Sequence, residues 1–160
     1  MSNGAAAAEV VITPEGFRTH WQGHRRLTRR VIEAFPEDQL FSYQVGGMRP
    51  FGVMVLELLS MAAPTVRGVA TGQWDHDMDR SVRPKAELLA AWDRDTVEID
   101  RNWPALTGKF QEQMTIYGEY TDLLCNLLLY IIDNEIHHRA QGYVYLRALG
   151  IEPPPFYVRD

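Results

Sequence analysis

The chain has 160 residues, of which 46% are hydrophobic and 23% are charged, so it can form one packed globular domain without stabilising cross-links. A single cysteine excludes a disulfide scaffold, and the net charge of −5 argues against binding to nucleic acid, which requires a basic surface. No apolar stretch reaches the ~20 residues of a membrane helix, and the N-terminus lacks the pattern of a secretory signal, so we expect a cytoplasmic protein without membrane contact.

Residues 1–12 are rich in small side chains and are expected to form a flexible tail, whereas residues 13–160 are expected to form a single domain. The first helix is predicted to begin at Thr13, whose hydroxyl can cap it and which precedes a proline at the first helical position. Apolar residues recur at spacings of three and four as far as Phe35. The proline that follows Phe35 ends the helix, because the residue before a proline disfavours the α conformation.

The second helix is predicted over residues 50–66, with Pro64 bending or ending it. It is apolar on nearly every side between residues 51 and 63, which predicts the most buried helix of the fold. A polar connector over residues 71–84 follows, and the third helix is predicted over residues 85–103.

Residues 109–120 show no clear periodicity and are predicted to form an irregular connection. The fourth helix is predicted to be capped by Thr121 and Asp122 and to run toward Gly150, which suits a C-terminal cap. Four long helical patterns without a recognisable strand predict an all-α fold, an antiparallel four-helix bundle.

Glu57 is the most informative residue of the second helix, because it is the only ionisable side chain between residues 51 and 63. Burying a carboxylate without a partner costs several kcal/mol. Glu57 is therefore expected to bind a ligand or metal ion or to take part in catalysis. The alternatives are that it faces a gap in the packing or pairs with an arginine of a neighbouring helix.

A second polar group interrupts the apolar pattern of the fourth helix. A heptad assignment places His138 in the bundle core, with Asn134 one turn earlier and Glu135 beside it, and places Asp133 and His137 on a different face. Spacings of three or four residues are those with which helical bundles hold metal ions. The alternative is a core histidine that only forms hydrogen bonds.

The first helix carries a further histidine pair, His20 and His24, at the same spacing of four. It could bind a metal ion, or it could simply be a stacked pair that packs against Trp21. The arginines of this helix are interpreted as a solvated face that acidic residues between positions 75 and 100 could neutralise.

Several short motifs, in this order and separation, resemble those of the DinB family of damage-inducible, metal-binding four-helix bundles. They are Arg49-Pro50-Phe51-Gly52, His137-His138-Arg139-Ala140-Gln141, Tyr145-Leu146-Arg147 and Leu149-Gly150.

The resemblance implies a divalent metal ion, because the family holds one with a histidine of the second helix and two histidines of the last. By position these ligands fall on Glu57, Asn134 and His138, so two of the three are not histidine here. Glu135 is the alternative third ligand. Such a set implies zinc, nickel, manganese or iron.

Two functions follow from these observations. The first, implied by the family resemblance, is a metal-dependent enzyme, a transferase or hydrolase, that transfers thiols or uses another metal-activated nucleophile on a small molecule, with His137 or Asp133 orienting a ligand. The second is a non-catalytic, stress-related bundle protein whose metal site is degenerate. In either case a homodimer is expected.

Overall fold

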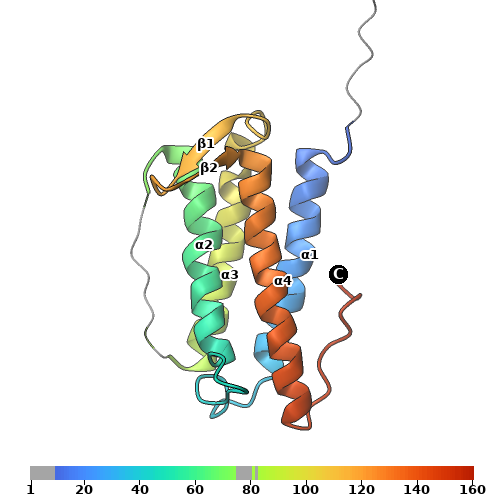
Figure 1. Cartoon of the computed structure of the whole chain (residues 1–160). Coiled ribbons are helices and arrows are strands. Elements are labelled where there is room, and N and C mark those ends of the chain that lie inside the picture. The colour runs from blue at the N-terminus through green and yellow to red at the C-terminus, as the bar shows by residue number, and fades with distance from the viewer. Residues whose placement is uncertain (1–9, 75–80, 82) are drawn as a thin grey trace, which may run out of the picture.

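The computed structural model of the protein describes residues 10–74, 81 and 83–160. In these residues the elements are α1 (Pro14–Ala34), α2 (Phe51–Thr71), α3 (Lys85–Asn102), the 3-10 turn η1 (Trp103–Ala105), β1 (Gln113–Ile116), β2 (Tyr120–Leu123) and α4 (Leu124–Ala148). The four helices form a bundle, and the strands lie across one of its ends (Figure 1). The predicted helices are present, but the fold is not purely helical. Most of the predicted tail and part of the polar connector lie outside the described residues.

The β1–β2 hairpin shows that the irregular connection predicted over residues 109–120 was wrong. The strands pair antiparallel, with Gln113 opposite Leu123 and Ile116 opposite Tyr120. In these strands Ile116 is the one buried side chain, so the alternation that marks a half-buried strand is missing from the sequence. The turn contains Gly118 in a left-handed conformation, with φ at 71°.

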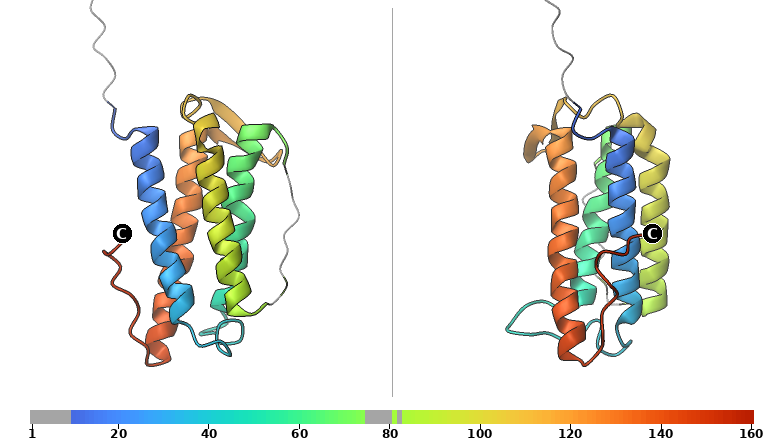
Figure 2. Two further views of the ribbon diagram at one scale, coloured as in Figure 1. Left: turned by 180° about the vertical axis from the view of Figure 1, so that it is seen from behind. Right: turned by 90° about the vertical axis from the view of Figure 1, so that its right-hand side faces the viewer.

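The helices of the bundle do not all alternate in direction. Contacts between Arg18 and Asp100 at one end, and between Lys85 and Phe35 at the other, make α1 and α3 antiparallel. In Figures 1 and 2, α2 and α3 both run toward the hairpin, whereas α1 and α4 both run away from it. The predicted antiparallel packing therefore holds for the neighbouring pairs α1·α3 and α2·α4, and the end of α2 and the start of α3 lie at opposite ends of the bundle.

The helix ends follow local chemistry with two differences from the prediction. Thr13 caps α1 by accepting a hydrogen bond of 3.0 Å from the backbone N–H of Gly16, as predicted. However, α2 continues past Pro64 and ends only at Gly72, which is left-handed with φ at 75°. The first residue of α4 is Leu124, later than predicted, because residues 120–123 pair in the hairpin.

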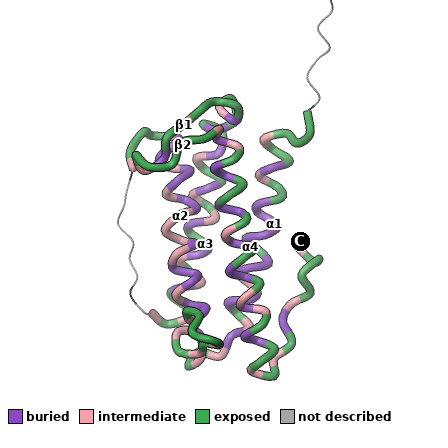
Figure 3. Tube along the Cα trace, viewed as in Figure 1, coloured by how far each residue is buried: buried purple, intermediate pink, exposed green. Residues whose placement is uncertain are grey.

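The core runs along the inward faces of all four helices (Figure 3). Its half near the hairpin contains Trp21 and Trp103, and the opposite half contains Phe51 and Trp92. The prediction that α2 is strongly buried is confirmed. Among the described residues α2 is also the one helix that is long and apolar enough to cross a membrane, but its burial in the bundle is typical of a core helix.

One α1 arginine contradicts the interpretation of these residues as a solvated face. Arg25 is only 1% exposed and bonds to Asp95 of α3 at 2.7 Å. Its guanidinium also stacks on Trp92, 3.6 Å from the ring centroid. Burial raises the pKa of Asp95 to about 6, although Arg25 acts in the opposite direction. Arg18 and Arg29 pair with α3 at the surface.

Candidate functional site

Antiparallel packing of α2 against α4 brings Glu57 and His138 together at the same depth of the bundle. The Nε2 atom of His138 lies 3.0 Å from Oε1 of Glu57. His138 is buried, whereas Glu57 is partly exposed. The two core polar residues singled out by the sequence therefore share one site.

Arg49 is the third member of this site. It lies just before α2 and bonds through Nη1 to the second carboxylate oxygen of Glu57, while its Nη2 lies 3.5 Å from Nε2 of His138. The hydroxyl of Tyr145 donates to the backbone carbonyl of Arg49 at 3.0 Å and so fixes the segment that carries it. An arginine was one of the alternatives for Glu57, but it comes from the loop that leads into α2 and not from a neighbouring helix.

The proton on His138 follows from these distances. A 3.0 Å contact between a ring nitrogen and a carboxylate requires a hydrogen between them, so Nε2 carries it and donates to Glu57. The Nδ1 atom of His138 is buried without a hydrogen-bond partner among the described residues. An unpaired lone pair at this position costs less free energy than an unpaired N–H group, which also places the hydrogen on Nε2. Burial disfavours ionised Glu57, but the hydrogen bonds from Arg49 and His138 outweigh it, so the pKa of Glu57 is below its ordinary value.

Asn134 completes the surroundings of the carboxylate. Its Nδ2 atom lies 3.4 Å from Oε1 of Glu57 and 3.3 Å from the sulfur of Met61. The structure thus brings together the three residues Glu57, Asn134 and His138 that the family resemblance marked as ligands. In this arrangement Asn134 presents its amide nitrogen, which donates hydrogen bonds and does not coordinate metal ions.

Glu135, the alternative third ligand, does not join this group. It is buried on the α1 side of α4, where it accepts a hydrogen bond of 2.6 Å from Thr28 and lies 3.6 Å from Arg139. His137 and Asp133 are exposed, and His137 contacts Gln141 at 2.8 Å. Their placement on a different face from His138 was predicted correctly, and it leaves them outside the site.

A groove of about 790 Å³ begins at Glu57 and extends toward the hairpin. Its lining residues come from α2, the hairpin and α4: Glu57, Ser60, Met61, Thr65, Ile116, Tyr117, Glu119, Tyr120, Thr121, Asp122, Asn126, Leu127, Tyr130 and Ile131. None of these described residues is basic, so the groove combines acidic and aromatic chemistry.

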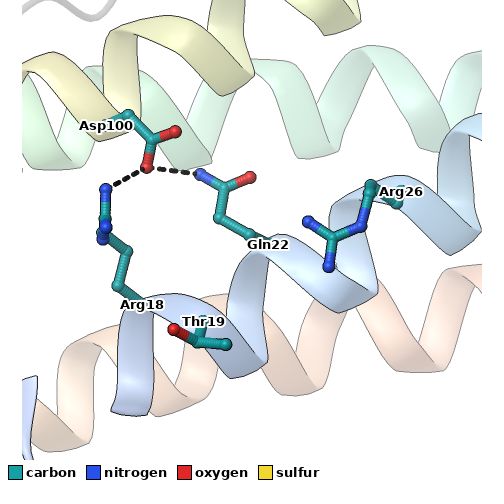
Figure 4. A pocket seen from close by; sticks show the side chains of 5 residues that line it. All are labelled: Arg18, Thr19, Gln22, Arg26 and Asp100. Carbon is teal, nitrogen blue, oxygen red and sulfur yellow. Dashed lines mark hydrogen bonds and ion pairs between the residues drawn. The ribbon is translucent and has the colours of Figure 1, made fainter. Parts of the chain in front are cut away.

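Two other polar features lie on α1. The rings of His20 and His24 are in contact with centroids 4.5 Å apart, but they meet edge to face and are not stacked, and His24 contacts Arg139. A smaller hollow of about 210 Å³ lies between α1 and α3, where Asp100 accepts hydrogen bonds from Arg18 and Gln22, both at 3.0 Å (Figure 4). The shared carboxylate of Asp100 joins the two helices here, which marks the hollow as a helix–helix contact.

Comparison with known proteins identifies the family. The sequence model of the DinB family matches residues 12–160. The chain belongs to the DinB family.

Two solved structures of DinB-like proteins are similar in fold. The one from Bacillus cereus ATCC 10987 has a TM-score of 0.72 at 17% identity, covering 92% of this chain and 100% of that protein. The one from Bacillus subtilis has a TM-score of 0.71 at 18% identity, covering 90% of this chain and 99% of that protein. No curated protein sequence matches the chain.

The donor set of this DinB-family protein does not fit a divalent metal ion. In the described part of the chain no three His, Cys, Asp or Glu side chains gather as a metal-binding group. Glu57 and His138 supply two donors, and Asn134 is at best a weak neutral ligand. The Arg49 guanidinium already bonds to the same carboxylate, so a dication would have to displace this positive charge.

Proposed function

We propose that this DinB-family protein binds a small organic amine in the groove between α2, α4 and the hairpin, and that it does so without a metal ion. One observation carries the metal-free part of the proposal. The Glu57 carboxylate accepts hydrogen bonds from Arg49, His138 and Asn134, so protein donors already surround the group that would bind a metal ion.

Arg49 supplies the positive charge that a metal ion would otherwise bring. Partial burial of a guanidinium or a carboxylate costs less free energy when the two are hydrogen-bonded to each other than when either is buried alone. His138 then holds the other carboxylate oxygen and joins α2 to α4. In this arrangement Arg49, Glu57 and His138 form a hydrogen-bonded polar cluster at the inner end of the groove.

The groove chemistry favours a cationic ligand with an apolar body. Glu119 and Asp122 provide negative charge near the hairpin, and the rings of Tyr120 and Tyr130 are exposed beside them. An ammonium group gains from carboxylates and from aromatic faces, whereas a carboxylate or thiolate ligand would be repelled. An organic amine is therefore the ligand class that these side chains support best.

A metal-dependent transferase is the second candidate, and one observation favours it. Oε1 of Glu57 and Nε2 of His138 converge within 3.0 Å, and the Arg49 side chain is about half exposed, so it can move away. Zinc, nickel, manganese and iron remain the candidate ions, and thiol transfer the candidate reaction.

Metal content distinguishes the two candidates. Protein prepared without chelator is analysed for zinc, nickel, manganese and iron, and titrated calorimetrically with each ion. We expect no stoichiometric binding to the wild type. A stoichiometric ion that is lost in both Glu57→Met and His138→Phe would establish the second candidate instead.

A gain of metal binding tests the role of Arg49. Asn134→His adds a donor next to His138, but we expect strong zinc or nickel binding only when it is combined with Arg49→Met, which removes the competing cation. Equal affinity of Asn134→His with and without Arg49→Met would contradict the proposed role of the guanidinium.

The ligand class is tested with matched probes. The ring of Trp74 lies beside the groove, with its centroid 5.2 Å from that of Tyr117. The fluorescence of Trp74 should therefore respond to 4-phenylbutylamine and not to 4-phenylbutyrate. We expect Glu119→Gln to weaken binding of the amine several-fold. Glu87→Gln, an exposed acid at the start of α3, serves as the control and should leave it unchanged. Equal binding of both probes would contradict the proposal.

A further inference from the structure

The segment after α4 folds back along α1 and α4 (Figures 1 and 2). Arg26 donates to the carbonyl of Arg159 at 3.0 Å, and Arg30 donates to the carbonyl of Asp160 at 3.0 Å. Gly23 allows this close approach, since a Cβ there would lie 3.2 Å from Cβ of Arg159. The returning segment is therefore held against the bundle by specific contacts.

A cavity of about 800 Å³ lies between this segment, α1 and α4, and it shares no lining residue with the groove. Its lining includes the guanidinium groups of Arg139, Arg147 and Arg159, against a single carboxylate, Glu152. The remaining lining is largely apolar and aromatic: Ile136, Tyr143, Val144, Pro153, Pro154, Pro155, Phe156 and Tyr157. The cavity thus combines an excess of positive charge with an apolar interior.

His24 stands between two of these arginines and cannot accept a hydrogen bond from both. Its Nδ1 lies 2.8 Å from Arg139 and its Nε2 lies 3.1 Å from Arg159. Burial, followed by the charges of Arg139 and Arg159, lowers the pKa of His24 to about 3, so the ring is neutral at pH 7. A neutral imidazole has one acceptor nitrogen. One guanidinium therefore points its N–H group at another N–H group.

The shorter of the two contacts, from Arg139 to Nδ1, makes Nδ1 the acceptor, so Nε2 carries the ring hydrogen and Arg159 has no acceptor on this ring. Arg139 donates to Thr28 at 3.0 Å and lies 3.6 Å from the Glu135 carboxylate. Nε2 of His20 lies 3.1 Å from Nε2 of His24 and can accept its hydrogen, which leaves Arg159 facing an N–H group.

Tyr143 supplies a second donor without an acceptor. Its hydroxyl is buried and has no hydrogen-bond partner in the described part of the chain. The charges of Arg139, Arg30, Arg147 and Arg159 all act on it. An oxygen anion in the cavity would satisfy both this hydroxyl and Arg159.

We propose that the cavity beneath the C-terminal segment binds an aromatic carboxylate, with its anionic group at Arg159 and Tyr143 and its ring among the apolar lining. A carboxylate matches the planar fork of a guanidinium, and the prolines and aromatic rings offer apolar surface to the rest of the ligand. This site is independent of the amine-binding groove.

Calorimetric titration with 2-naphthoate tests the proposal, with neutral 2-naphthamide as the matched probe. We expect one naphthoate per chain, at least tenfold weaker binding of the amide, and about tenfold weaker naphthoate binding in Arg159→Gln. Tyr143→Phe removes only the unpartnered hydroxyl, so it should keep the fold and weaken binding several-fold.

Controls separate this site from the rest of the molecule. Arg94→Gln removes an exposed arginine of α3, and Glu119→Gln alters the groove, so both should bind naphthoate like the wild type. Absence of binding at millimolar naphthoate, equal binding of the amide, or unchanged binding in both Arg159→Gln and Tyr143→Phe would each overturn the proposal. Thermal denaturation shows whether each variant is folded. If Arg159→Gln does not fold, naphthoate binding to Tyr143→Phe tests the proposal.

Discussion

The energetic coupling between Arg49, Glu57 and His138 provides a direct test of the polar cluster at the inner end of the groove. A double-mutant cycle combines Glu57→Met with His138→Phe, and a second cycle combines Glu57→Met with Arg49→Met. Each substitution keeps a side chain of similar length or shape while removing its hydrogen-bonding atoms. The cycles therefore isolate the two pairwise interactions of the carboxylate.

The expected magnitudes follow from exposure. The side chains of His138 and Glu57 are 6% and 29% exposed, and a hydrogen bond to a charged group in such a setting contributes about 1.5–3 kcal/mol. The Arg49 side chain is 48% exposed, so solvent screening reduces its ion pair with Glu57 to below about 1 kcal/mol. We therefore expect the His138–Glu57 coupling to exceed the Arg49–Glu57 coupling.

Urea denaturation at pH 7 measures both couplings, and for a domain of this size about 1 kcal/mol corresponds to a change in Tm of ~2–4 °C. Because the folded-state pKa of Glu57 lies below its ordinary value, its stabilising contribution is complete above that ordinary value. The contribution is lost as the pH falls through the lower, folded-state pKa. A larger coupling to Arg49 than to His138, or no coupling at all, would refute this account. So would a chelator that lowers the Tm of the wild type by several degrees.

Three further predictions concern the bundle. Arg25→Met leaves Asp95 buried without its partner and should cost about 3–5 kcal/mol in urea denaturation; a loss below 1 kcal/mol would contradict it. The pKa of Asp95 is raised to about 6, so the stability it contributes is present below pH 4 and lost as the pH rises through 6, and Asp95→Asn should flatten this part of the stability profile. A Cβ at position 142 would lie 2.6 Å from the ring of Phe51. Gly142→Ala should therefore destabilise the protein by about 1–3 kcal/mol, although alanine has the better helix propensity. An increase in Tm would count against this close contact.

The sequence determined the helices and the polar core residues, because both leave local or periodic signals. Apolar spacing, the Thr13 cap and the terminal prolines identified α1, and the lone acid Glu57 in an apolar helix was conspicuous without any structure. The heptad assignment also separated buried His138 from exposed His137. These features depend on neighbours within a turn or two of helix, which the sequence records directly.

The tertiary structure decided how these residues are satisfied and which way the helices run. Only the packed structure shows which partner each polar group has. Arg49 bonds to Glu57, Thr28 to Glu135, and Arg25 to Asp95. The hairpin escaped the periodicity analysis because most of its side chains are exposed, so its stability rests on backbone pairing that leaves little pattern in the sequence. Glu135 and Thr28, and Asp95 and Arg25, lie 70 or more residues apart along the chain and meet only when the bundle closes. Arg49 and Glu57 are only eight residues apart, but Arg49 lies outside the helix, so helical spacing does not predict their contact.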